Sequence, residues 1–491
     1  MSLRPRWLAF LFLTALFGAA LVALNQAGFW PVVMLTHTAK TLFTRADADY
    51  DRLEADRLEQ QVGIAGNGVP QLGREGNAYW TGYRGARGDG IYAERELASE
   101  WPAAGPPRLW RQPSGGGWAS FAIAKGLAVT LEQRRDDEAV VAYGLESGSE
   151  VWVHRYPARF EETISGEGPR ATPVITGDQV VALGATGELR CLALATGELR
   201  WQRNVLADGA AGNLTYALSA SPIAVRLDGG EALPGSDENQ DTPSVAIIVL
   251  TGAPESDACV HAFSVGDGER LWSALPEDGG AYATPTLAEI GGSQQLVVAT
   301  ASRIVGLRPD DGALLWESPW SVQSGLTIAQ PIVLEDDRVL VSSGYGAGAV
   351  MLQVTRMEQN FQTEAVWRSK RLKTKFNSAV HRGDYVYGLD EGTMTCVELA
   401  TGKRIWKGGR YGYGQMLLAG DGILVISESG EVARVTASPD GFEETGRFEA
   451  IEGTTWNVPA LAEGLLLVRN AAEMACFDLN LPDGASPVTA E

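Results

Sequence analysis

Cysteine and histidine are scarce in this chain, with four residues of each among 491. No two cysteines are adjacent and no C-x-x-C pair occurs, so the cysteine spacings of zinc sites and haem attachment segments are missing. The histidines are scattered over distant parts of the sequence and give no metal-ligand spacing. We therefore predict no metal centre.

The four cysteines lie in similar short apolar runs, LRCLAL, ACVHAF, MTCVEL and MACFDL, which place them at Cys191, Cys259, Cys396 and Cys476. We interpret them as one equivalent position in different structural repeats. Unpaired cysteine is often a small buried residue. The sequence therefore predicts buried, structural thiols.

Positive charge is in the minority, with 40 Lys and Arg against 61 Asp and Glu and a formal net charge of −21. Nucleic-acid binding draws its affinity from clusters of Lys and Arg. We identify no basic stripe and predict no nucleic-acid partner. The acidic surface favours solubility of a large protein.

Familiar catalytic and ligand-binding motifs are also missing. No G-x-S-x-G elbow marks a nucleophile, so a lyase or hydrolase is neither supported nor excluded. The run GGRYGYG at 408–414 lacks the ending of a phosphate-binding loop, and the acidic insertion 228–244 lacks the spacing of an EF-hand. We interpret both as connecting loops.

An uncharged apolar run extends from Trp7 to Leu24 and follows Arg4 and Arg6. Its eighteen residues are close to the minimum for a transmembrane helix, and the positive flank favours a cytoplasmic N-terminus. We predict that 1–35 is an uncleaved anchor in a bacterial inner membrane, with the rest in the periplasm or outside the cell. A cleaved signal peptide is the competing interpretation. No cysteine follows the run, which disfavours a lipoprotein anchor.

Residues 36–78 are expected to form a stalk and a linker. The stretch from Ala39 to Gln61 is charged and free of glycine, which predicts a short helix near the membrane. The stretch from Gly63 to Asn77 is rich in glycine and is interpreted as the linker.

A glycine followed four residues later by tryptophan recurs at the end of apolar runs. It occurs at Gly148 and Trp152, Gly197 and Trp201, Gly268 and Trp272, Gly312 and Trp316, and Gly402 and Trp406. This spacing predicts a tight turn that needs a permissive backbone, then an outer strand whose tryptophan packs between neighbouring sheets. Trp367 keeps the ring without the glycine, and Phe448 keeps only an aromatic ring.

A second pattern precedes the innermost strand of each unit. It reads WASF, RATP, SASP, YATP, IAQP, FNSA, YGQM and WNVP, from Trp118 to Trp456. Eight small antiparallel units that cannot stand alone predict a radial repeat architecture. The last unit lacks an outer strand, and Arg108 to Arg111 can supply it and remove an open edge. We predict an all-β, eight-bladed β-propeller over 79–480, with a tail at 481–491.

The repeats, above all ATPVITGDQVVALGATGELRCLALATGELRW and TMTCVELATGKRIW, resemble the pyrroloquinoline quinone (PQQ) propeller repeat. This repeat occurs in quinoprotein dehydrogenases and in the periplasmic propeller of the outer-membrane β-barrel assembly machinery. The lead-in WTGYRGARGDG, from Trp80 to Gly90, resembles the segment that precedes bacterial PQQ-like propellers. The resemblance implies the fold, whereas function depends on grafted sites.

For the quinoprotein enzymes, the resemblance implies calcium and PQQ at the channel mouth, with a disulfide between adjacent cysteines that this chain lacks. Asn377 and Asn457 are the weak candidates for amide ligands. Turn or strand-end hydrogen bonding is the competing interpretation. No catalytic residue is assigned.

The residue three places before the proline position is aromatic in five of the eight copies. The predicted binding-face ring consists of Trp118, Arg170, Tyr282, Phe376, Tyr413 and Trp456, with Ser219 and Ile328 completing the positions. Aromatic and Arg side chains are enriched among interface anchors. The alternative is that these side chains only cover the ends of the inter-blade cores. Arg170 is the one charged member.

These observations favour a membrane-anchored, non-catalytic binding or scaffold protein of the cell envelope without a cofactor. Its partner would be an envelope protein or a small ligand at the propeller face. The alternative is an oxidoreductase of alcohols or sugars that depends on PQQ and calcium.

Overall fold

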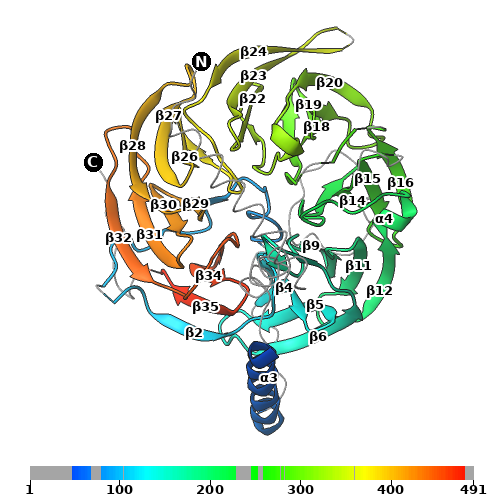
Figure 1. Cartoon of the computed structure of the whole chain (residues 1–491), viewed down its shortest axis with the longest axis vertical. Coiled ribbons are helices and arrows are strands. Elements are labelled where there is room, and N and C mark those ends of the chain that lie inside the picture. The colour runs from blue at the N-terminus through cyan, green and yellow to red at the C-terminus, as the bar shows by residue number, and fades with distance from the viewer. Residues whose placement is uncertain are drawn as a thin grey trace, which may run out of the picture.

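The computed structural model describes residues 47–67, 79–102, 104–227, 245–252, 258–276, 278–280, 282–358 and 360–480. Eight β-sheets surround a central axis, as Figure 1 shows, and this confirms the all-β, eight-bladed propeller. Within a blade, consecutive antiparallel strands run outward from the axis. Gly-centred turns separate the Val- and Leu-rich strands, so each short apolar run forms one strand.

Blades 1 to 4 each contain four strands, in chain order from the axis outward. Blade 1 has β3 (Ala122–Ala124), β4 (Leu127–Arg134), β5 (Asp137–Gly144) and β6 (Glu150–Pro157), and blade 2 has β9 (Val174–Thr176), β10 (Gln179–Leu183), β11 (Glu188–Ala193) and β12 (Leu199–Asn204). Blade 3 has β13 (Ile223–Arg226), β14 (Val245–Leu250), β15 (Val260–Ser264) and β16 (Arg270–Ala274), and blade 4 has β17 (Thr286–Ile290), β18 (Ser293–Ala299), β19 (Arg303–Leu307) and β20 (Leu314–Pro319).

Blades 5 to 7 follow the same order. Blade 5 has β21 (Ile332–Val333), β22 (Arg338–Ser343), β23 (Gly348–Arg356) and β24 (Phe361–Ser369), and blade 6 has β25 (Val380–Arg382), β26 (Tyr385–Asp390), β27 (Thr393–Glu398) and β28 (Arg404–Arg410). Blade 7 has β29 (Gln415–Ala419), β30 (Gly422–Ile426), β31 (Glu431–Thr436) and β32 (Glu444–Glu449). Small elements decorate the connections, namely β7 (Glu161–Glu162) with β8 (Gly166–Glu167), α4 (Val205–Asp208) and a 3-10 turn, η1 (Gln323–Gly325).

Blade 8 joins the two ends of the propeller. It contains β33 (Ala460–Ala462), β34 (Leu465–Arg469) and β35 (Glu473–Asp478), and its outermost strand is β2 (Arg108–Pro113). Trp110 of β2 lies opposite Cys476 of β35 in an antiparallel pair. The prediction that an N-terminal strand closes the ring is therefore confirmed, and the pairing removes an exposed edge.

A contact between tryptophan and glycine links neighbouring blades and explains the repeated spacing. The indole of Trp201, on the outer strand of blade 2, donates to the carbonyl of Val265 in blade 3 at 2.8 Å. Six of the seven outer-strand tryptophans bond the next blade in this way. A Cβ on Gly268 would lie 2.6 Å from the Trp201 ring, and Gly268 has a φ of +74°. The glycine therefore receives the ring of the preceding blade, while the tryptophan four residues later contacts the following blade.

Replacing Gly268 with alanine should destabilise the propeller by more than the cost of its backbone conformation alone. The left-handed backbone costs a residue with a Cβ about 1–2 kcal/mol, and the methyl group would also displace Trp201. Gly177→Ala is the matched control, because Gly177 has a φ of +59° and open space around a Cβ. Thermal unfolding of the full chain measures both variants. An equal loss in the two would contradict a role for this contact.

Two blades depart from this pattern. Trp316 of blade 4 donates to Gln295 of its own blade at 2.7 Å, so its indole makes no hydrogen bond to blade 5 among the described residues. In blade 7 the position equivalent to tryptophan is Gly446, opposite Arg434. Trp101 fills that space, since a Cβ on Gly446 would lie 3.0 Å from its ring. The assignment of Phe448 to this position was therefore wrong by two residues.

All four cysteines are buried and unpaired, as expected. Cys191 and Cys396 lie opposite Trp201 and Trp406, in the same place as Cys476 opposite Trp110. Cys259 differs, because Ala262 is the residue opposite Trp272. The prediction of one shared position is therefore correct for three cysteines and wrong for Cys259, which precedes its strand.

The Ser or Thr of the second pattern connects the inner strands around the axis. The backbone N–H of Ser120 donates to Thr172 Oγ1 at 3.0 Å, and the N–H of Thr172 donates to Ser221 Oγ at 2.9 Å. The N–H of Ser221 continues the series to Thr284 Oγ1 at 3.0 Å. Each buried donor is thus satisfied by the next blade, which explains the recurring hydroxyl residue.

The lead-in segment from Trp80 to Gly90 lies in the central channel, and Figure 1 shows this blue stretch at the centre of the ring. Its backbone accepts hydrogen bonds from the inner strands of blades 1 and 2, at Ile123 and Ile175. It continues into β1 (Ile91–Tyr92), which pairs in parallel with β29 as an additional innermost strand of blade 7. Because this segment plugs the channel, we call it the plug.

The expected N-terminal helix is α3 (Asp47–Asn67), which also includes the first residues expected in the linker. Figure 1 shows it beside β2 and β6, projecting from the circumference. Its Tyr50 and Leu53 are buried against the propeller, whereas Leu58 is 63% exposed. Arg57 donates to the carbonyl of Pro113 at 2.8 Å. The helix is therefore docked on the closing blade rather than free.

The predicted membrane anchor, Trp7 to Leu24, lies outside the described residues. Within the part of the chain that the structure describes, no helix has the length and apolar character needed to span a membrane. The acidic insertion 228–244 and the tail 481–491 also lie outside the described residues.

Candidate functional site

The eight residues that precede the innermost strands lie at one end of the propeller, because all innermost strands start at that end. We call this end the rim. Seven of the eight are half-buried, namely Trp118, Ser219, Tyr282, Ile328, Phe376, Tyr413 and Trp456. The residues that follow them in the pattern are buried. The rim residues therefore expose part of their surface over a tightly packed channel wall.

Four rim residues form one continuous aromatic cluster. The rings of Trp118 and Trp456 have centroids 4.8 Å apart, and Phe376 lies 5.0 Å from Trp456 and 5.2 Å from Tyr413. These residues come from blades 1, 8, 6 and 7, so the cluster joins four consecutive blades at the rim. Tilted and edge-on aromatic pairs of this kind add stability beyond simple burial.

Tyr282 lies apart from this cluster. Its partner is Tyr216, at a ring centroid distance of 5.9 Å, and burial raises the pKa of Tyr282 above its ordinary value. Tyr216 belongs to the connection between blades 2 and 3. The rim thus has an aromatic cluster on one side and a tyrosine pair elsewhere, rather than a uniform ring.

Arg170 is buried, with 8% of its surface exposed. Its guanidinium donates to the carbonyls of Gly168 and Gly166, at 2.6 and 3.1 Å, and lies over the Phe160 ring. Burial lowers its pKa to about 10, although nearby carboxylates raise it. Arg170 therefore supports the β7–β8 hairpin in this structure, and its role in ligand binding stays a prediction.

Buried amide side chains hold the aromatic cluster together. Gln415 donates from Nε2 to the carbonyls of Phe376 and Trp456, both at 2.9 Å. Asn457 donates from Nδ2 to the carbonyl of Ala119 at 2.8 Å. The backbones that carry three rim residues are thereby fixed relative to one another, so the cluster is preorganised.

Asn377, the other candidate amide ligand, is 1% exposed, and within the described residues neither polar atom of its side chain has a hydrogen-bond partner. The two residues that follow it accept hydrogen bonds from Arg84 of the plug, through the carbonyls of Ser378 and Ala379 at 3.4 and 2.9 Å. Burial lowers the pKa of Arg84, and nearby groups raise it again only in part.

The Arg84 guanidinium, held against the backbone that follows Asn377, disfavours a divalent cation close to that backbone. The plug also fills the channel along which Asn377 and Asn457 would have to converge, since they belong to blades 6 and 8. Among the described residues, no group of three His, Cys, Asp or Glu could hold a metal ion. We derive no chemistry through calcium and PQQ, and the expectation that the chain holds no cofactor stays a prediction.

Two rim residues were not identified from the pattern. Lys375 Nζ lies 4.2 Å from the Tyr413 ring and 5.4 Å from the Tyr345 ring, in cation–π contact. Burial raises the pKa of Tyr345 to about 12. Tyr345 sits in the turn between β22 and β23, so it lies outside the repeated four-residue pattern. Lys375 directly precedes Phe376. The basic residues that come before it in the sequence could have identified it as part of a positively charged segment.

Comparisons with known proteins agree with the geometry. A family model described as outer membrane protein assembly factor BamB matches residues 91–233 and 239–408. The outer membrane protein assembly factor BamB of Burkholderia pseudomallei is 26% identical over 261 residues. That alignment covers 49% of this chain and 66% of the relative, just under two thirds of its length.

Solved structures show the same fold. BamB from Moraxella catarrhalis superposes with a TM-score of 0.51 at 15% identity, over 76% of this chain and 99% of that one. Quinohemoprotein alcohol dehydrogenase from Comamonas testosteroni gives 0.56 at 11% identity, over 89% and 86% of the two chains. At these identities the likeness concerns the fold alone, and both relatives carry the PQQ-like propeller expected from the sequence.

Proposed function

The chain belongs to the family described as outer membrane protein assembly factor BamB, and from this premise we propose that it is a non-catalytic scaffold of the cell envelope. It would bind another envelope protein through the rim and support the assembly of outer-membrane proteins. The observation that carries this proposal is the preorganised aromatic cluster of Trp118, Phe376, Tyr413 and Trp456 at an accessible end of a plugged propeller.

The chemistry of the rim supports binding rather than catalysis. Half-buried aromatic residues on fixed backbones are the residue type that dominates interface energetics. Behind them, the plug places the Arg84 guanidinium in hydrogen-bond contact with the backbone of blade 6. The proposal therefore includes no cofactor and no reacting group.

Membership of the same family also supports a proposal for the location. We propose that the propeller functions in the periplasm, where a factor that assists outer-membrane proteins would meet its partners. Attachment to the inner membrane through Trp7 to Leu24 remains part of the proposal. Docking of α3 on the closing blade would then hold the propeller close to the membrane surface.

Replacing Trp118, Tyr413 and Trp456 with alanine should abolish partner binding. Interface anchors cost about 2 kcal/mol or more each when truncated, so recovery of a cross-linked partner should fall by at least about tenfold. The measurement is cross-linking in intact cells, followed by affinity purification of the full-length chain. Unchanged recovery of the partner would count against the rim.

The matched control removes three exposed apolar side chains from outer strands, Leu109, Leu271 and Leu314, which are 43%, 46% and 47% exposed. This control should leave partner recovery unchanged. Thermal unfolding of both triple variants shows whether the propeller is intact. A Trp118→Phe variant keeps an aromatic ring and should retain most of the binding.

A further inference from the structure

A basic segment in this acidic protein leads from the circumference to the rim. It contains five cations in eight residues, Arg368, Lys370, Arg371, Lys373 and Lys375, and no Asp or Glu occurs between Trp367 and Gly383. The segment begins at the end of β24, the outer strand of blade 5, and ends beside Phe376 of the aromatic cluster. We call it the basic track. The sequence interpretation, which identified no basic stripe, passed over it.

Most charges of the basic track are not neutralised by carboxylates. Lys373 pairs with Asp390 and Glu391 at 3.3 and 3.0 Å. Arg368 and Arg371 are exposed, and neither has an ion-pair partner in the part of the chain that the structure describes. Because the protein carries a net charge of −21, this local excess of positive charge is opposite in sign to the charge of the whole chain.

Lys370 and Lys375 fix the two ends of the basic track. Lys370 Nζ donates to the carbonyls of Gly346 and Ala347, the latter at 2.8 Å, in the turn between β22 and β23. Lys375 lies against the rings of Tyr345 and Tyr413. The positive charges are therefore held in place beside aromatic surfaces.

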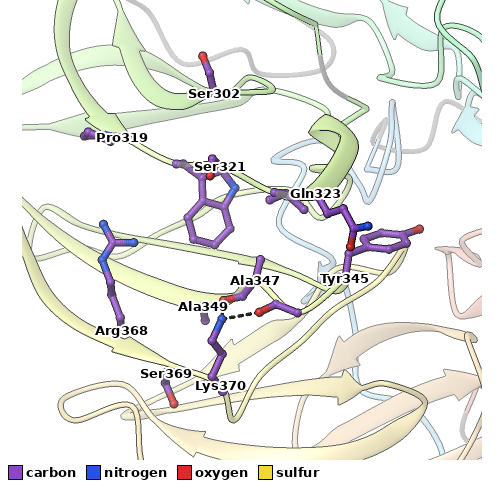
Figure 2. A pocket seen from close by; sticks show the side chains of 13 residues that line it. Ser302, Pro319, Ser321, Gln323, Tyr345, Ala347, Ala349, Arg368, Ser369 and Lys370 are labelled. Atoms are coloured by element: carbon purple, nitrogen blue, oxygen red, sulfur yellow. Dashed lines mark hydrogen bonds between the residues drawn. The ribbon is translucent and has the colours of Figure 1, made fainter.

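A cavity of about 550 Å³ opens beside the basic track, between blades 4 and 5. Its lining includes Trp320, Tyr345, Arg368 and Lys370, and no lining residue is acidic. Figure 2 shows Arg368 at one end of the cavity and Tyr345 at the other, with the Lys370 hydrogen bond between them. At this same blade junction, within the described chain, the Trp316 indole bonds its own blade and not the next one, although that hydrogen bond lies at the opposite end of the blades.

The cavity combines aromatic walls with the guanidinium group of Arg368. This combination suits a ligand in which a carboxylate is attached next to an apolar group. Arg binds carboxylates in bidentate geometry, and the Trp320 and Tyr345 rings offer contact to an adjoining side chain. A small anion would occupy the cavity and leave the rest of the basic track without a ligand. The basic track instead continues from Arg368 to Lys375, so a chain-like ligand matches its whole length.

We propose that the cavity and the basic track bind an extended acidic segment of a partner polypeptide, which continues onto the aromatic cluster. This inference rests on the proposed scaffold function and adds the chemistry of the partner. Carboxylates of the segment pair with Arg368 and Arg371, and its apolar side chains pack on Tyr345 and Tyr413. Electrostatic complementarity of this kind selects the partner and orients it.

The test measures fluorescence anisotropy of a labelled peptide of alternating glutamate and leucine, titrated with the full chain in detergent. We expect binding that weakens as salt is added, and no binding of the same peptide with lysine in place of glutamate. The double variant Arg368→Gln/Arg371→Gln should weaken binding by about tenfold or more. The control Arg108→Gln/Arg155→Gln changes the net charge equally, at exposed arginines of blades 8 and 1, and should leave the affinity unchanged.

Several results would overturn the proposal. Equal affinity of the two double variants would show that net charge alone controls binding. Equal binding of the acidic and basic peptides would contradict the proposal that the partner segment is acidic. A third result would be binding of vesicles that contain phosphatidylglycerol in place of the peptide. If that binding also depended on Arg368 and Arg371, the basic track would bind lipid headgroups and not a polypeptide. In each case, the cross-linking experiment on the aromatic cluster would still give its own result. Failure of the acidic-segment proposal is therefore distinguishable from failure of the scaffold function.

Discussion

Replacing Glu132 with glutamine should lower the free energy of unfolding by about 3–5 kcal/mol, the cost of removing one partner from a buried ion pair. Glu132 of β4 has no exposed surface. It accepts hydrogen bonds from Arg134 Nε at 3.1 Å and from the Tyr143 hydroxyl at 2.8 Å. Glutamine keeps the shape but removes the charge, which leaves buried guanidinium groups with less compensation.

The effect of Glu132→Gln should depend on pH. Burial alone would raise the pKa of Glu132, but the guanidinium groups of Arg134, Arg469 and Arg57 outweigh it and lower the pKa from 4.5 to about 2. A carboxyl group with a lowered pKa in the folded state stabilises the protein above its unfolded pKa, and loses this effect as pH falls through the folded value. The difference between the wild type and the variant should therefore be full above about pH 5 and shrink toward pH 2.

Chemical denaturation of the full chain at a series of pH values measures this difference. Glu146→Gln is the control, because Glu146 is an exposed carboxylate in the same blade. It should have little effect at any pH. A small loss for Glu132→Gln, or a large loss that stays constant down to pH 2, would contradict the role assigned to this group.

Replacing Arg84 with alanine should release the plug and destabilise the propeller by about 3–5 kcal/mol, in the range for large-to-small substitutions in cores. Arg84 is 2% exposed. It donates to four backbone carbonyls, those of Ser378, Met416, Ala379 and Asp89, at 3.4, 3.3, 2.9 and 3.1 Å. Alanine would leave these buried acceptors without that donor and would open a cavity.

Limited proteolysis and thermal unfolding together measure the Arg84 effect. We expect new cleavage within the plug, between Trp80 and Gly90, along with the lower melting temperature. Arg87→Ala is the matched control in the same segment, because Arg87 is 67% exposed and, among the described residues, pairs only with Asp89. Arg84→Lys should recover part of the loss, since its ammonium group can still donate to some of the carbonyls. A plug that remains protected in Arg84→Ala would overturn this account.

The sequence predicted the parts of the fold that depend on local chemistry. The spacing from Gly268 to Trp272 identified the blades because a tight turn and an outer-strand indole are both local requirements. The donated strand β2 was predictable because the last repeat is visibly short of one strand. Trp101 could not be assigned in this way, because it lies outside the repeats. Its packing against Gly446 depends on the folded structure and leaves no pattern in the sequence.

The same distinction applies to the site. Phe376, Tyr413 and Trp456 share a repeat position, and the architecture brings them together with Trp118. Arg170 shares that position too, yet the β7–β8 hairpin covers it, and no periodicity indicates the hairpin. Tyr345 reaches the rim from a different turn of its blade, so its contribution emerges only from the packing of neighbouring blades.

The way blade 8 is assembled also sets the order of events during folding. Arg108 pairs with Phe477 in the final ladder, across nearly the whole described propeller, whereas blades 1 to 6 are built from strands close together in sequence. Pairings between distant segments form slowly because loop closure costs entropy before any contact is gained. Early blades can therefore fold while the chain is still being synthesised, but β2 must wait for β35. Until the last strand emerges, the protein is an open arc with two unprotected edges.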